Sequence, residues 1–170
     1  GLISATPLVL VSRKGGWNDM KALIAAAKAN PGKISYGSGG NGAISHIVGE
    51  TFKKEAGVDL LHVPYKGNAQ ALIDVAAGQI SFMLDQISVA SAYVNVGKVR
   101  ALGVSTLTRS PLFSNVPTID EAGVKGFDMD SWAGLFAPAG TPPEVVAKLN
   151  AELRRIIDNP EIRAKIAVLG

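Results

Sequence analysis

The sequence predicts an α/β fold in which a mostly parallel sheet is flanked by helices. Short apolar runs of strand length alternate with segments whose apolar residues recur at helical spacing. This alternation is typical of βαβ units joined by right-handed crossovers. The chain is also long enough to bury a core, since 47% of its 170 residues are hydrophobic.

The first expected element is a buried strand over residues 7–12, PLVLVS. In the helix that follows, Asn18 is the expected N-cap, and the Asn30-Pro31-Gly32 turn is the expected stop. Further elements are expected at residues 33–36 (strand), 37–42 (glycine-rich loop), 43–56 (helix ended by Gly57), 58–67 (strand and tight turn), 68–77 (helix), 79–84 (strand), 86–96 (helix) and 98–105 (strand).

The remaining segments are less regular until the C-terminal part of the chain. Residues 108–123 are expected to form a loop with one helical turn, and residues 127–138 to be extended. Pro142-Pro143 opens a helix, and Pro160 opens a last short one from its first position. The apolar residues expected to face inward are Ile44, Ile47, Val48 and Phe52; Leu72, Ile73 and Ala76; and Val145, Val146, Leu149, Leu153 and Ile156.

In sheets of this kind, ligands bind beyond the carboxyl ends of the strands, where loops meet helix N-termini. The sequence therefore indicates three strand-to-helix turns, at residues 37–43, 64–68 and 85–86. The first contains Gly37, Gly39 and Gly42 in the G-x-G-x-x-G spacing of dinucleotide-binding loops.

A dinucleotide site also needs an acidic residue at the end of the next strand. That strand ends in HVPYKG, and Asp59 lies at its opposite end. A phosphate-binding P-loop is excluded because Ala43, not lysine, follows Gly42. The G-x-S-x-G motif of serine hydrolases is also absent from the sequence. The residues instead indicate an anion cradle.

In such a cradle, glycines let several backbone N–H groups converge, and the helix from Ala43 adds partial positive charge. Ser38, Asn41 and Ser45 supply side-chain donors, which suits a carboxylate or a small phosphate. The alternative is a structural turn in which Ser38 or Asn41 caps the helix.

Charge and composition argue against several other classes of protein. The formal charge is +3, without a basic cluster of the kind that binds nucleic acid. There is no cysteine, and His46 and His62 are too few for a histidine-rich metal site. Residues 75–97 are better explained by a strand and a helix than by a membrane span. The first residue is glycine, so the chain is expected to be processed or excised.

Three motifs together, YGSGGNG, HVPYKG and VPTIDEAG, carry a family resemblance. The chain resembles the Bug (TctC-like) extracytoplasmic solute receptors, the substrate-binding proteins of tripartite tricarboxylate transporters. The likeness continues through SWAGLFAPAGTPPEVVAKLNAEL and covers nearly all of the chain from Pro7.

The resemblance implies two lobes of the type II periplasmic-binding-protein kind that close around a small carboxylate. It divides the chain into residues 1–12 (N-terminal segment and first crossing strand), 13–127 (ligand-binding second lobe) and 128–170 (second crossing strand and helices of an incomplete first lobe). The family's Pro-Gly-Gly loop is missing, so the sequence is expected to be a fragment. The resemblance also implies a periplasmic, non-catalytic receptor that works with membrane permease subunits and is not itself embedded in the membrane. It implies no cofactor, metal or nucleic acid.

The site residues that the resemblance implies come from all three turns. They are Ser38, Gly39, Asn41, Gly42, Ala43 and Ser45; Tyr65, Lys66, Gly67 and Asn68; and Asp85. Lys66 either sets the local field or is a solvated lysine, and Tyr65 belongs to the cleft wall or to the core. Asp85 either caps the helix from Gln86 or holds a ligand amino group or a water.

Packing roles are expected for the other aromatic and imidazole groups. His62 is expected in the core, His46 packed or facing solvent, and Trp132 packed rather than bound to ligand. Two further functions are weighed against a receptor. One is an enzyme that binds a nucleotide or phosphorylated substrate, and the other is the ligand-sensing domain of a regulator.

Overall fold

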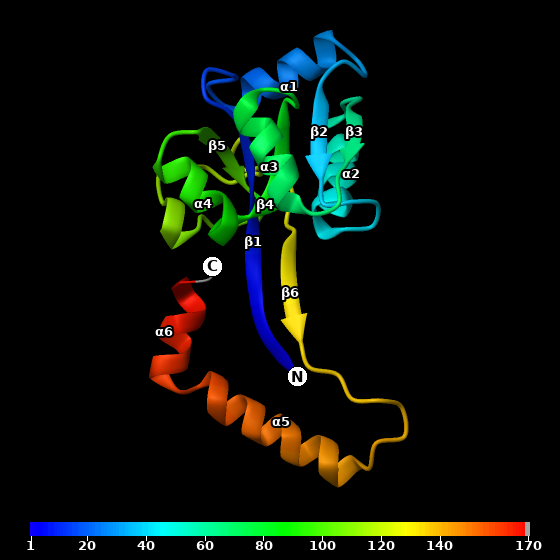
Figure 1. Ribbon diagram of the computed structural model, residues 1–170, viewed down its shortest axis with the longest axis vertical. Helices are drawn as coiled ribbons and strands as arrows, with labels where there is room; N and C mark the ends of the chain where they lie inside the picture. Colours follow the sequence, from blue (N-terminus) through cyan, green and yellow to red (C-terminus); the bar gives the residue numbers. More distant parts are fainter. Residues whose placement is uncertain (169–170) are drawn as a thin grey trace.

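The structure is a computed structural model and describes residues 1–168. Figure 1 shows an α/β lobe from which a two-stranded ribbon leads to a pair of C-terminal helices. The strands are β1 (Leu2–Arg13), β2 (Ser35–Ser38), β3 (Leu61–Pro64), β4 (Phe82–Gln86), β5 (Val99–Val104) and β6 (Asp130–Gly134). The α-helices are α1 (Met20–Ala29), α2 (Ile44–Ala56), α3 (Asn68–Ala77), α4 (Ile87–Asn95), α5 (Pro143–Ile157) and α6 (Pro160–Val168), with a short 3-10 helix at Pro111–Phe113.

The lobe is built on a sheet with the strand order β3-β2-β4-β1-β5. β2 pairs in parallel with β3 and with β4, whereas β1 runs antiparallel to both β4 and β5. Four of these five strands therefore point the same way, which confirms the mostly parallel sheet. β1 is the exception because it enters the lobe from the ribbon, where its first half pairs with β6.

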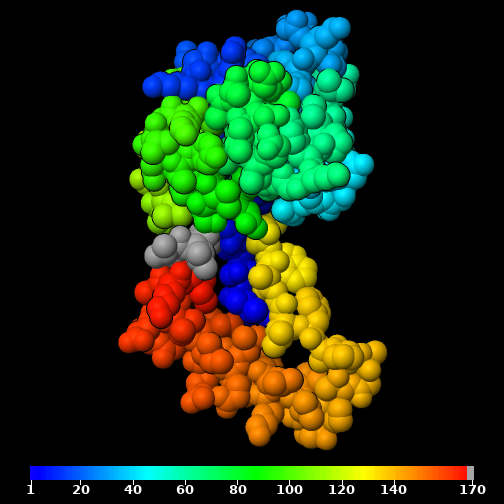
Figure 2. All heavy atoms as spheres, in the orientation of Figure 1, coloured from blue at the N-terminus to red at the C-terminus, as the bar shows by residue number. Residues whose placement is uncertain are grey.

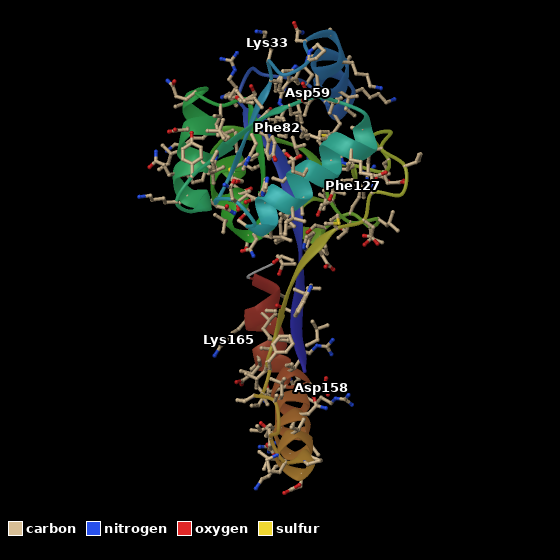
Figure 3. The ribbon with its side chains drawn as sticks, turned by 90° about the vertical axis from the view of Figure 1, so that its right-hand side faces the viewer. Lys33, Asp59, Phe82, Phe127, Asp158 and Lys165 are labelled. Atoms are coloured by element: carbon tan, nitrogen blue, oxygen red, sulfur yellow. The ribbon has the colours of Figure 1, made fainter. Side chains whose placement is uncertain are left out.

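Two apolar layers cover the two faces of this sheet. Leu8 and Leu10 of β1 join a cluster with residues of α1 and α2, whereas Val9 and Val11 join a second cluster with residues of α3 and α4. This alternation follows from the two-residue period of a strand. Phe82 and Phe127, both in the first cluster, lie inside the lobe in Figure 3.

The C-terminal helices lie apart from this core. In Figure 2, α5 and α6 form an arm below the lobe: α5 lies beyond the far end of the ribbon of β1 and β6, and α6 turns back beside the ribbon. The face of α5 expected to point inward is largely open, since Val145, Val146, Leu149 and Ile156 are each more than 40% exposed. An apolar groove of about 650 Å³ lies between α5 and the segment after β6.

Several sequence expectations are wrong in detail. Asp19, not Asn18, caps α1, because its carboxylate accepts from the Ala22 N–H at 2.8 Å. β1 is longer than residues 7–12, because its first half also pairs with β6, and β2 begins at Ser35 rather than at residue 33. Ile47 and Ile73 are 48% and 47% exposed, because their helices bury the faces containing Gly49 and Ala71 instead.

Candidate functional site

The three predicted turns lie together at one edge of the sheet. β2, β3 and β4 each end at this edge and each leads into a helix, so the N-termini of α2, α3 and α4 meet there. Gln86 at the end of β4 pairs with Leu8 of β1, just where β1 leaves the ribbon. The Gln86 side chain also donates to Ser131 of β6 at 3.4 Å. The edge therefore faces the ribbon and the C-terminal arm (Figure 1).

A chain of hydrogen bonds joins the three turns. The Asp85 Oδ1 atom accepts from the Asn68 side-chain amide at 2.6 Å. The Asn68 Oδ1 atom accepts from the Ser45 hydroxyl at 3.0 Å, and the Ser45 Oγ atom accepts from the Gly39 N–H at 3.0 Å. A Cβ at residue 39 would overlap the Asn68 side chain, so glycine is required for this approach. One side chain at each turn thus takes part in a chain of hydrogen bonds that holds the three turns together.

Asp85 is not the N-cap that one interpretation expected. It lies inside β4, and α4 begins after Gln86, whose side chain makes no cap bond. The carboxyl group is 1% exposed and also accepts from the Gln86 N–H at 2.9 Å. Its Oδ2 atom is buried and has no hydrogen-bond partner in the described residues. Burial raises the pKa of Asp85, although the bonds from Asn68 and Gln86 oppose the shift.

The glycine-rich loop uses most of its own N–H groups internally. Gly39 donates to Ser45, Gly40 to Ser38, Gly42 to the His46 ring and Ala43 to the Gly40 carbonyl. The cradle expected from the glycine N–H groups is therefore wrong for Gly39, Gly40 and Gly42, and the Ala43 N–H is also used within the loop. The reason is that the polar side chains around the loop satisfy it locally.

Free donors lie instead at the helix starts. The N–H groups of Ile44 and Ser45 in α2, and of Asn68 and Ala69 in α3, have no acceptor within residues 1–168. The Asn41 N–H in the loop is also free within this part of the chain. Such N–H groups carry the positive end of the helix dipole, so the edge can receive negatively charged oxygen.

Two histidines support the loop from one side, which sequence reasoning missed. The His46 Nδ1 atom accepts from the Gly42 N–H at 3.0 Å, and His62 Nε2 lies 2.6 Å from the Ser38 Oγ atom. The two rings stack with their centroids 4.1 Å apart. The four-residue separation of Gly42 and His46 was a possible signal, but the contact between His46 and His62 depends on how α2 lies against β3.

The second turn is tied to the first through its backbone. Tyr65 and Gly67 donate their N–H groups to the carbonyls of Ser38 and Gly39. The Tyr65 hydroxyl donates to Asp74 of α3 at 2.7 Å, and burial together with this bond raises the pKa of Tyr65 to about 12.

The Lys66 side chain is exposed and makes no salt bridge within the described chain. Asn41 and Gly42 are exposed, and Ala43 is partly so.

Within residues 1–168, no group of three or more His, Asp or Glu side chains is arranged to hold a metal ion. None of the described helices combines the length and the apolar character that a membrane crossing requires.

The profile of the family described as "Tripartite tricarboxylate transporter family receptor" matches residues 2–170. The chain belongs to this family. The resemblance inferred from the loop motifs is thereby confirmed. Among curated proteins, the UPF0065 protein of the tcbD–tcbE intergenic region of Pseudomonas sp. (strain P51) is 40% identical over 171 residues, which is 99% of this chain and 51% of that protein. The receptor chain thus spans about half the length of this relative.

Two similar proteins have been solved together with a ligand. Rpa4515 of R. palustris, solved with adipate, has a TM-score of 0.90 and 34% identity, over 99% of this chain and 57% of that one. MatC (Rpa3494) of Rhodopseudomonas palustris, solved with bound malate, has a TM-score of 0.87 and 34% identity, over 99% and 58%. The fold of the receptor chain is therefore that of these binding proteins.

Proposed function

We propose that the receptor chain is the part of a periplasmic solute-binding protein that seats one end of a small carboxylate. The complete protein delivers this ligand, a di- or tricarboxylate or a related organic acid, to the membrane permease subunits of a tripartite tricarboxylate-type transporter. It binds without chemical turnover, and closure of two lobes around the ligand signals the loaded state.

One observation carries this proposal. The side chains of Asp85, Asn68 and Ser45 lock three turns into one edge, at which the unpaired N–H groups of α2 and α3 lie. A rigid edge of this kind loses little freedom when it binds a ligand. Each charge-assisted hydrogen bond to a carboxylate contributes about 1.5–3 kcal/mol. Three or four of them are enough for micromolar affinity after the cost of association.

The site residues have different parts in this proposal. Ser45, Asn68 and Asp85 position the edge, and the free N–H groups of residues 41, 44, 45, 68 and 69 receive the carboxylate. Lys66 is exposed and without an ion-pair partner in the described chain, so it adds positive potential without ordering the loop. Tyr65 braces α3 through its hydrogen bond to Asp74.

A receptor is favoured over an enzyme by the state of the contact between Ser38 and His62. Ser38 and His62 lie within hydrogen-bonding distance, as a serine nucleophile and its base would. Ser38 is completely buried, however, and its Oγ atom also accepts from the Gly40 N–H at 3.1 Å. The hydroxyl therefore holds the loop and is closed to a substrate.

The rest of the first lobe is expected to come from residues outside this chain. Residues 13–127 then form the ligand-proximal lobe, β1 and β6 the crossing strands, and α5 and α6 a part of the other lobe. The open apolar face of α5 is consistent with this division.

The proposal is tested by removing one free N–H group without altering the helix. Ile44 is the first residue of α2, a position that favours proline, and Ala43 already has the extended backbone that proline requires before it. Ile44→Pro removes the N–H, and Ile44→Ala removes as much of the side chain while keeping it. Titrations of malate and adipate are followed through the backbone amide resonances of the chain.

Malate or adipate is expected to shift the amide resonances of residues 41–45 and 67–69, with millimolar affinity for the chain alone. Ile44→Pro should weaken this binding about tenfold relative to Ile44→Ala, because one charge-assisted bond is lost. Equal affinity of the two variants, or shifts confined to other residues, would contradict the proposed seat. Shifts on adding NAD instead would favour the nucleotide-binding alternative.

A further inference from the structure

The stacked histidines lie where the glycine-rich loop meets α2 and β3. His46 is on the first turn of α2 and His62 is in the middle of β3, with ring planes 15° apart. Each ring uses one nitrogen on the loop: His46 on the Gly42 N–H, and His62 on the Ser38 hydroxyl. Both contacts therefore end on the glycine-rich loop.

The two contacts respond differently to a proton. Gly42 can donate to the His46 Nδ1 atom only while that nitrogen carries no proton, so the imidazole must be neutral. Protonation at Nδ1 would place two donors opposite each other, the Gly42 N–H and the His46 Nδ1–H, and the hydrogen bond would be lost. The His62 contact survives in either state, because the Ser38 hydroxyl can both donate and accept. His46 is therefore the group whose charge the loop can sense.

The groups around the pair come from helix α2 and strand β2. Glu50 and Lys53 follow His46 on α2, and they form a salt bridge of 3.2 Å. Tyr36 of β2 stacks on His62 with ring centroids 4.9 Å apart and donates its hydroxyl to Glu50 at 2.5 Å. The Glu50 carboxylate is thus already bonded to Tyr36 and Lys53, and it offers only partial compensation for an imidazolium.

Electrostatics keep His62 neutral. Burial, followed by the charge of a protonated His46 and of Lys53, lowers the pKa of His62, and Glu50 opposes the shift. A histidine with a lowered pKa contributes stability above its ordinary value of about 6.5 and loses it as the pH falls through the lowered value.

We propose that His46 is a positioning residue that makes the order of the glycine-rich loop, and hence anion binding at the edge, sensitive to acid. Neutral His46 holds the Gly42 N–H and keeps the loop in its bound form. Protonated His46 releases the Gly42 N–H, and the part of the loop around Gly42 becomes less ordered, while the bonds of Gly39 and Gly40 hold the rest. The part of this inference that concerns anion affinity rests on the proposed function.

Protonation also adds a positive charge near the edge, which by itself would attract a carboxylate. That charge is partly screened by solvent and by Glu50. The free Asn41 N–H lies next to Gly42 in the loop, so we expect the loss of loop order to weaken binding by more than the added charge strengthens it. The inference therefore requires affinity to fall on acidification.

The test uses the 170-residue chain, whose two histidines make its imidazole titrations simple to assign. In His46→Asn the side-chain oxygen replaces Nδ1 as an acceptor and cannot titrate. The amide of Gly42 is followed by NMR between about pH 5 and pH 7.5, a range that spans the ordinary imidazole pKa. The amide of Gly57, which ends α2, reports whether the helix stays intact.

In the unaltered chain, the Gly42 resonance should shift with the same midpoint as the His46 ring. Its protection from hydrogen exchange, corrected for pH, should fall about tenfold in acid, while Gly57 stays constant. In His46→Asn the Gly42 resonance should not titrate. A constant Gly42 resonance while His46 titrates, or the same titration in His46→Asn, would overturn the inference.

Malate affinity measured across the same range completes the test. It should fall about threefold more in the unaltered chain than in His46→Asn, since protonation of malate itself is common to both. A fall of equal size in both would overturn the link to anion binding. If malate binds neither protein at any pH, the proposed function fails, and the Gly42 resonance still decides whether His46 controls the loop.

Discussion

Asn68 is the residue on which the candidate site most depends. Its side-chain amide donates to Asp85 and its carbonyl oxygen accepts from Ser45, so the two halves of one side chain connect two other turns. Because Asp85 can only accept from Asn68 and the Ser45 hydroxyl donates, the orientation of the amide is fixed.

Replacing Asn68 should therefore cost more than its size suggests. Asn68→Ala leaves the buried Ser45 hydroxyl without its acceptor and Asp85 without one of its two donors, and should lower the free energy of unfolding by about 2 kcal/mol. The matched control is Gln70→Ala on the same helix, which removes one exposed bond to Asp74 and should cost less than about 0.5 kcal/mol. Urea denaturation measures both, and similar losses would contradict the role given to Asn68.

For single residues, the sequence indicated which ones belong to the candidate site. It did not indicate which hydrogen bonds they make there. Ser45, Asn68 and Asp85 were all expected at the site from the family resemblance, and the structure brings them together. Their bonds to one another were not predictable, because each bond joins different turns. Ser45 was expected to donate to a ligand, yet its hydroxyl proton is used on Asn68.

Helix α2 directly follows the glycine-rich loop, so the distance at which α2 packs on the sheet affects where the loop lies. It lies close to β2 because Gly49 faces the Tyr36 ring, and a Cβ at residue 49 would overlap that ring. Tyr36 cannot move aside easily, since it is fully buried between the rings of His62 and Phe82.

This packing reverses the usual effect of a helix substitution. Alanine in place of glycine normally stabilises a helix interior by about 1 kcal/mol. Gly49→Ala should instead destabilise the protein by about 1–3 kcal/mol, because the added methyl group pushes α2 away from β2. Glu55→Ala, at an exposed position of the same helix, should change stability by less than about 0.5 kcal/mol. A stabilising Gly49→Ala in thermal unfolding would disprove the close packing.

Element boundaries followed from local signals more closely than buried faces did. α3 spans residues 68–77 as expected, and Gly57 ends α2 as expected, because glycine and turn residues act locally. The errors at Ile47 and Ile73 arose because small residues at 49 and 71 let the helices approach the sheet on a neighbouring face. Apolar spacing alone does not register such an approach.

In the molecule as a whole, the buried core ends where the C-terminal arm begins. All residues of the two core clusters lie between Leu8 and Phe127, whereas none of the residues of α5 is buried. Under the proposed function, a further segment of the complete receptor covers α5.

The open face of α5 makes a prediction that depends on chain length. In the present chain, Leu149→Glu should change the free energy of unfolding by less than about 0.5 kcal/mol and should reduce binding of an apolar dye. In a receptor of the relatives' full length, it should cost about 2–5 kcal/mol, because Leu149 would then be buried. Lys148→Glu, at an exposed neighbouring position, should have little effect on stability in either. Equal effects of Leu149→Glu in both chains would show that α5 stays uncovered.

The sequence by itself determined the α/β alternation, most element boundaries, the three turns and the receptor family, since these depend on local spacing and on motifs. Only the tertiary structure decided which N–H groups are free, how Asp85 and Asn68 are used, and that His46 meets His62. The physical reason is that hydrogen bonds between turns are set by how helices pack on the sheet. That packing brings together residues far apart in sequence. It depends on single contacts, such as that of Gly49 with the Tyr36 ring.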